Sequence, residues 1–111
     1  MDDIFKKSIL YDLYGGLLSE NQKTVYGYHV IDDLSFAEIG EELNITRQAA
    51  HELFKTADKK LKEIDKKLEL NSRFRDIEQY ANKIIKLATG NNEIIKLSNK
   101  IINKTLKGGN N

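Results

Sequence analysis

Hydrophobic residues recur three or four positions apart along nearly the whole chain, which is the spacing of α-helices that bury one face. The pattern predicts a helix over 3–14, which Gly15-Gly16 ends, and a second helix over 19–31. Ser19 and Gln22 form a capping box at the start of the second helix, where their side chains satisfy otherwise unpaired backbone amides. Both helices are expected to belong to a compact N-terminal unit.

Residues 35–55, SFAEIGEELNITRQAAHELFK, carry the pattern of a helix-turn-helix. Ser35 and Glu38 form a second capping box, and Gly40 is small enough for two helices to cross closely. Asn44 tolerates the left-handed conformation that ends a helix sharply, and Thr46 can cap the next helix. The sequence therefore predicts two helices joined by a tight turn, with the second helix presented to a partner.

The second helix of this motif has an inward and an outward face. The residues expected to turn inward are Ala49, Ala50 and Leu53 or Phe54, and those expected to face outward are Arg47, Gln48, His51, Glu52 and Lys55. Arginine and glutamine suit the base edges of guanine and adenine, and lysine suits a phosphate. The candidate nucleic-acid contacts are Thr46, Arg47, Gln48, His51 and Lys55. The alternative is an ordinary solvated face, because Glu52 and the acidic residues Glu38, Glu41 and Glu42 would repel a duplex.

From Phe54 onward, hydrophobic positions alternate by three and four residues over a longer stretch. The positions are Ala57, Leu61, Ile64 and Leu68, then, after an expected break at Asn71-Ser72, Phe74, Ile77, Ala81, Ile84 and Ala88. Gly90-Asn91-Asn92 ends that helix, and a last amphipathic helix is predicted from Ile94, Leu97, Ile101 and Leu106. Such alternation is typical of helices that pack nearly parallel. Two alternatives stay open: a homodimer joined through the C-terminal helices, and a monomer that folds the helices back on themselves.

Length and composition agree with an all-α fold. A chain of 111 residues normally forms one domain, so we expect a single all-helical domain over 1–111. Its parts are a helix-turn-helix unit at 1–55, amphipathic helices at 56–107 and a disordered tail at 108–111. Proline, which interrupts helices, is absent, and the absence of cysteine excludes disulfides and thiolate metal sites. No apolar segment resembles a signal peptide or a membrane span of ~20 residues, so we expect a cytoplasmic protein without membrane contact.

The net charge of +1 hides an asymmetry between the two halves. Residues 1–54 carry four basic residues against ten acidic ones, a balance of −6, and residues 55–111 carry fourteen against seven, a balance of +7. Phosphate neutralisation supplies most non-specific DNA affinity, so an acidic helix-turn-helix half disfavours DNA binding. The stretch KKLKEIDKK at 59–67 adds further candidate contacts to RNA phosphates, namely Lys59, Lys60, Lys66 and Lys67. The alternative for this stretch is a solvated helix face with mixed charges.

Tyrosines and histidines give little sign of catalysis. Tyr11, Tyr14, Tyr26 and Tyr28 are expected to line a small core rather than an exposed recognition surface. His29 and His51 lie on different predicted helices, and neither has a neighbouring serine or acid in the pattern of an activated nucleophile. The glycines form no phosphate-binding loop. We therefore expect no enzyme, no metal and no cofactor.

Three pieces of the sequence resemble the YlxM family of small helix-turn-helix proteins. They are LYDLYGGLLSENQ at 10–22, DDLSFAEIGEELNITRQAA at 32–50 and KTADKKLKEIDKKLEL at 55–70. The resemblance covers 10–74 and implies an all-helical fold, and little after about residue 75 matches. It places the family's TRQA-type start of the second helix on Thr46, Arg47, Gln48 and Ala49. The segment is also similar to region four of sigma factors, which shares the helix-turn-helix.

Genes of the YlxM family characteristically neighbour those of the signal recognition particle GTPases. The resemblance thus implies an accessory role with that particle, through its protein, its RNA or both. Where the family usually has a bulkier aliphatic residue, a tyrosine and a basic residue, this chain has Ala50, His51 and Thr56. Two hypotheses follow: a non-enzymatic accessory or regulatory protein of the targeting pathway, and a transcriptional regulator that reads DNA through 35–55. The acidic N-terminal half and the missing charge at Thr56 favour the first.

Overall fold

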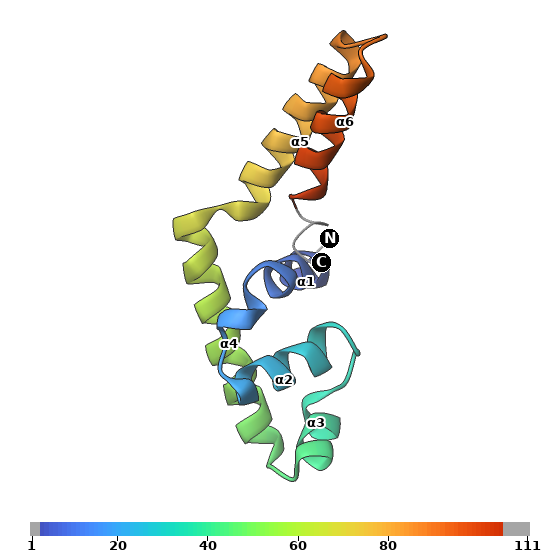
Figure 1. Ribbon diagram of the computed structural model, residues 1–111. Coiled ribbons are helices and arrows are strands. Elements are labelled where there is room, and N and C mark those ends of the chain that lie inside the picture. The colour runs from blue at the N-terminus through green and yellow to red at the C-terminus, as the bar shows by residue number, and fades with distance from the viewer. Residues whose placement is uncertain (1–2, 106–111) are drawn as a thin grey trace. The chain divides into compact units, whose positions relative to one another are not determined.

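The computed structural model describes residues 3–105, which contain six α-helices and a short 3-10 helix but no strand (Figure 1). The elements are α1 (Asp3–Tyr14), η1 (Gly15–Leu17), α2 (Glu20–Val30), α3 (Phe36–Leu43), α4 (Arg47–Leu68), α5 (Leu70–Leu87) and α6 (Asn92–Asn103). The all-α prediction is confirmed. The expected contribution of Leu106 and the expected tail at 108–111 lie outside the described residues.

The chain divides into two compact units, Met1–Leu68 and Glu69–Asn111. The boundary expected at residue 55 lies inside α4, which continues without interruption to Leu68. Neither glycine nor proline occurs between Arg47 and Leu68, and buried residues follow one face at helical spacing through Ala50, Phe54, Ala57 and Leu61. The second helix of the helix-turn-helix and the lysine-rich stretch are therefore parts of one helix.

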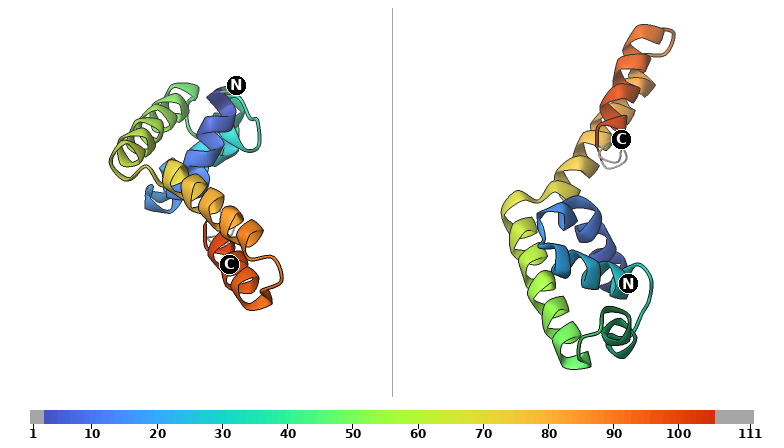
Figure 2. Two further views of the ribbon diagram at one scale, coloured as in Figure 1. Left: turned by 90° about the horizontal axis from the view of Figure 1, so that it is seen from above. Right: turned by 60° about the horizontal axis from the view of Figure 1, so that its bottom comes forward.

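The first unit packs α1, α2 and α3 against one side of α4, as the right-hand view of Figure 2 shows. Its largest fully buried side chains are Tyr14, Tyr26, Ile39, Leu61 and Val25. The phenol of Tyr14 donates a hydrogen bond of 2.7 Å to Asp65, and that of Tyr26 donates one of 3.1 Å to Asp58. Buried tyrosines normally find such partners. The expected core role of these two tyrosines is confirmed, whereas Tyr11 and Tyr28 are only half-buried.

The turn between α3 and α4 has the features that the sequence predicts. Both hydrogen bonds of the Ser35–Glu38 capping box are present. Asn44 ends α3 in the left-handed conformation with φ 58°, and the Thr46 hydroxyl accepts a hydrogen bond of 2.9 Å from the Ala49 amide. A Cβ atom on Gly40 would lie 2.7 Å from the carbonyl oxygen of Ile45. Only glycine lets the turn lie this close to α3.

The second unit is a hairpin of α5 and α6, which run antiparallel side by side (Figure 1). The helix break expected at Asn71-Ser72 is wrong, because both residues lie within α5. The break occurs at Glu69, whose φ of 53° is left-handed and interrupts the helical path. At the other end, Gly90 has φ 87°, and the Asn91 side chain caps α6 by accepting a hydrogen bond of 3.2 Å from the Ile94 amide.

Candidate nucleic-acid interface

One line of exposed polar residues runs along α4, from the helix-turn-helix into the lysine-rich stretch. Its members are spaced alternately by four and three residues: Gln48, Glu52, Lys55, Lys59, Lys62 and Lys66. This spacing keeps all six on one face of the helix. The rise of 1.5 Å per residue gives the line a length of about 27 Å. We call this line the α4 stripe.

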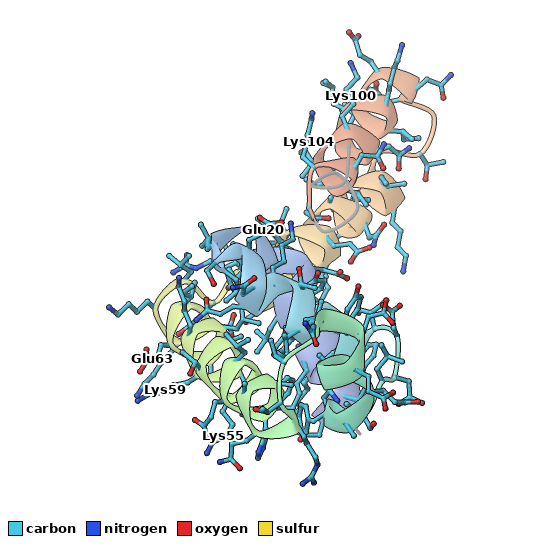
Figure 3. The ribbon with its side chains drawn as sticks, turned by 90° about the horizontal axis from the view of Figure 1, so that it is seen from below. Glu20, Lys55, Lys59, Glu63, Lys100 and Lys104 are labelled. Carbon is cyan, nitrogen blue, oxygen red and sulfur yellow. The ribbon has the colours of Figure 1, made fainter. Side chains whose placement is uncertain are left out.

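A shallow groove lies alongside the α4 stripe. It is lined by Phe54, Lys55, Asp58, Lys59, Lys62, Glu63 and Lys66. Figure 3 shows Lys55, Lys59 and Glu63 projecting from α4 away from the body of the first unit. Four lysines in one line make the groove a surface for a chain of anionic groups, with Asp58 and Glu63 as the opposing charges in its lining.

Asp58 anchors the inner edge of this groove. Its Oδ1 accepts hydrogen bonds from Lys7 at 2.9 Å and from Tyr26 at 3.1 Å, and its Oδ2 lies 2.9 Å from Lys62 Nζ. Burial raises the pKa of Asp58, but the hydrogen bonds from Lys62, Lys7 and Tyr26 and the charge of Lys7 outweigh it and hold this pKa below its usual value. Asp58 therefore stays charged, fixes one lysine of the α4 stripe and ties it to α1 and α2.

The hydrogen bond to Asp58 and its charge raise the pKa of Lys62, so this lysine stays protonated while the neighbouring carboxylate compensates part of its charge. Lys55 lies 3.6 Å from Glu52, but both side chains are more than half exposed, so this pair is weak. Of the four lysines in the α4 stripe, Lys62 is held by Asp58, whereas Lys55, Lys59 and Lys66 are exposed without a partner in the core among residues 3–105.

The structure brings together only some of the predicted contacts. Gln48, Lys55, Lys59 and Lys66 share the α4 stripe, and Arg47 is exposed in the first turn of the same helix. Lys60 and Lys67 are also exposed, but each follows a stripe residue by one position and so points about 100° away around the helix. The hydroxyl of Thr46 caps α4. Lys62 was not among the predicted contacts, although its spacing from Lys55 and Lys59 could have indicated it.

His51 has a packing role that the sequence did not reveal. Although exposed, its ring lies 4.7 Å from that of Phe36, measured between centroids. It ends a series of six neighbouring rings that connects α1, α2, α3 and α4, in the order Tyr11, Tyr26, Phe54, His29, Phe36 and His51. Within this series, His29 Nδ1 donates a hydrogen bond of 2.8 Å to the carbonyl oxygen of Leu34. His51 therefore helps to hold α3 against α4.

Acidic residues are exposed on α3, the helix that packs against the first part of α4. Glu38, Glu41 and Glu42 are all exposed on α3, and Glu38 is engaged in the capping box. The first unit carries ten basic residues against thirteen acidic ones, a balance of −3. With a net charge of +1 for the whole chain, the second unit carries +4, so the charge asymmetry persists between the two units.

Sequence comparison identifies the family. The family model described as "Putative helix-turn-helix protein, YlxM / p13 like" matches residues 1–101. This chain belongs to that family. The match extends well beyond residue 74, where the resemblance seemed to end, and includes α5 and most of α6. The C-terminal hairpin is thus part of the YlxM / p13-like family pattern.

Named relatives in this family cover most of the chain. UPF0122 protein YlxM of Bacillus subtilis is 33% identical over 79% of this chain and 80% of its own length. A UPF0122 protein of Clostridium botulinum is 42% identical over 72% of this chain and 73% of its own length. Another, of Desulforamulus reducens, is 37% identical over 81% of this chain and 77% of its own length. No solved structure was found to match.

Among residues 3–105, no helix is both long and apolar enough to span a bilayer.

Proposed function

We propose that this protein binds the phosphate backbone of a structured RNA through the α4 stripe, as an accessory component of the signal recognition particle pathway. The main observation in support of this proposal is the line of four lysines along one face of a single helix, namely Lys55, Lys59, Lys62 and Lys66. Lysines contact phosphates as point charges and need no base code, so the line suits shape-based RNA binding. Membership in the YlxM / p13-like family supports the pathway only through the accessory role that the resemblance to that family implies.

The distribution of charge supports RNA over duplex DNA. A helix-turn-helix that docks in the major groove brings the helix before the reading helix close to the DNA backbone. In this protein that helix is α3, which presents Glu38, Glu41 and Glu42. Lys60 and Lys67 lie off the stripe and are not part of this proposed contact. The same acidic surface of α3 could face a basic protein partner on the particle.

A second candidate function is that of a DNA-binding transcriptional regulator. One observation favours it: Arg47 and Gln48 are exposed in the first turn of α4, directly after a well-formed helix-turn-helix turn. Residues at this position contact base edges in helix-turn-helix proteins. Lys55 would then meet a phosphate, while the contact of His51 with Phe36 limits its freedom to read bases.

An affinity pull-down of the tagged protein from its own lysate, with and without nuclease, separates these functions. We expect recovery of the signal recognition particle and its loss after RNase treatment, because the contact is carried by RNA. Arg47→Ala should leave this recovery unchanged. Recovery of a single chromosomal DNA region without the particle would instead establish the regulator, and selection from random duplexes should then enrich one motif.

A further inference from the structure

The hairpin of α5 and α6 is joined through a seam of small residues. Ala81 of α5, Ala88 directly after α5 and Ser98 of α6 are buried, while Ile95 and Ile102 are half-buried on the same side of α6. Small residues let two helices approach closely. As a result, the larger apolar residues predicted to face the neighbouring helix lie on another side of the hairpin.

One face of the hairpin carries these larger apolar residues in the open. They are Ile77 (39% exposed), Tyr80 (63%), Ile84 (41%) and Leu87 (88%) on α5, and Ile94 (40%), Leu97 (56%) and Ile101 (44%) on α6. The two rows meet in a groove, whose lining includes Ile77, Leu97 and Ile101. Lys100 of α6 and Lys104 directly after α6, both labelled in Figure 3, are part of its lining. We call this surface the hairpin face.

The hairpin face is too apolar to be an ordinary solvated surface. Single exposed apolar residues are common on monomers, but contiguous patches beyond a few hundred Å² mark interaction sites. Seven large side chains at three-and-four spacing on adjacent helices form such a patch, and a tyrosine among them is typical of interfaces. Two helices with one apolar face are half of a four-helix bundle.

Charged residues border the hairpin face in a self-complementary order. On α5, Asp76 precedes Lys83 by seven residues, and on α6, Glu93 precedes Lys100 by seven; all four are exposed. Seven residues return a helix to nearly the same direction, so each pair lies along one border of the face. Because Ile77 lies beside Leu97 and Ile101, the midpoints of the two pairs fall at about the same level of the hairpin.

We propose that the hairpin face binds the hairpin face of a second copy of this chain, forming an antiparallel four-helix bundle. A two-fold axis in the plane of the face can lie across the helices or along them. An axis across them places Asp76 opposite Lys83 of the second copy, and an axis along them places Asp76 opposite Lys100. In both arrangements, Glu93 likewise meets a lysine. A copy whose four border charges all had one sign would instead repel an identical copy.

This charge order gives a direct test with the full-length chain in analytical ultracentrifugation. One variant, Asp76→Lys/Glu93→Lys, makes all four of these border positions basic, and the other, Lys83→Glu/Lys100→Glu, makes all four acidic. We expect the wild type to dimerise, each variant alone to associate at least about tenfold more weakly, and an equal mixture of the two to recover dimers. Recovery in the mixture also shows that both variants are folded.

The apolar part is tested by Leu97→Glu, with circular dichroism as the check on helix content. This variant should be monomeric at concentrations where the wild type is dimeric. A wild type that stays monomeric across the concentration range would overturn the proposal and assign the hairpin face to another occupant. The proposal would also be overturned if each border variant alone formed dimers as well as the wild type does. Sedimentation and circular dichroism are measured without RNA or DNA. The dimer proposal can therefore be correct even if the proposed RNA-binding function is wrong.

Discussion

The ammonium of Lys7 lies 2.9 Å from Oδ1 of Asp58, although 51 positions separate these residues in the sequence. The contact joins the first helix of the chain to the middle of α4. Both side chains are largely shielded, with exposed fractions of 12% and 15%. Lys62 and Tyr26 bind the same carboxylate. Asp58 thus links the core of the first unit to the α4 stripe.

Replacing this carboxylate should destabilise the first unit. Asp58→Asn removes the charge that holds Lys7 and Lys62, and hydrogen bonds to charged groups contribute about 2 kcal/mol. We expect the free energy of unfolding in urea to fall by about that amount. Glu63→Gln, an exposed carboxylate on the same helix, is the matched control and should change it little. Equal effects of both substitutions would show that the Asp58 cluster is not a stabilising contact.

The same carboxylate should make stability depend on pH. The pKa of Asp58 is lower in the folded protein than its ordinary value of 3.8, so the unfolded chain binds the proton more readily. The stabilisation is therefore present above about pH 4 and is lost as the pH falls through the folded pKa. Unfolding measured from about pH 6 to 3 should show a steeper loss for the wild type than for Asp58→Asn. Parallel curves would contradict this assignment.

Glycine at position 40 should be required for the helix-turn-helix turn. Gly40→Ala places a methyl group 2.7 Å from the Ile45 carbonyl oxygen, which belongs to the backbone and cannot rotate away. Overpacking of this kind costs about 1–3 kcal/mol, and we expect a corresponding drop in thermal stability. Gly16→Ala is the control, because a Cβ atom there meets nothing within 4 Å. A Gly40→Ala protein as stable as Gly16→Ala would mean that α3 and the turn can separate at no cost.

Features set by a few neighbouring residues could be predicted from the sequence. The capping boxes at Ser19 and Ser35 and the left-handed Asn44 follow from local hydrogen bonding and backbone preference, and all three are present. The break at Glu69 could not be predicted in this way. Glutamate has no special preference for the left-handed conformation that it adopts there.

Packing between helices was harder to predict. On α6, two apolar rows lie side by side, and periodicity alone cannot tell which row faces α5. The expected row, Ile94, Leu97 and Ile101, is exposed, and the row one position further along is inward. The small residues Ala81 and Ser98 lie at the seam because they let the two helices approach closely. Such a seam can be predicted only when both facing helices are known. The same holds for the contact between His51 and Phe36.

The candidate site was predicted in part. The sequence identified candidate lysines in the dense run at 59–67. Which of them belong to the α4 stripe could not be predicted, because it depends on α4 being one continuous helix. Once that continuity is known, Lys62 joins the site, and Lys60 and Lys67 lie outside the α4 stripe.

The most direct test of RNA binding by the α4 stripe compares two double variants that remove the same charge from one helix. Binding of a fluorescent RNA hairpin is measured between 50 and 200 mM salt for the wild type, Lys59→Ala/Lys66→Ala and Lys60→Ala/Lys67→Ala. Each lost phosphate contact lowers the slope of log affinity against log salt by about one. We predict a slope lower by about two for Lys59→Ala/Lys66→Ala, which changes the α4 stripe, and a nearly unchanged slope for Lys60→Ala/Lys67→Ala, which does not. Equal slopes for the two variants would contradict a phosphate-binding stripe on α4.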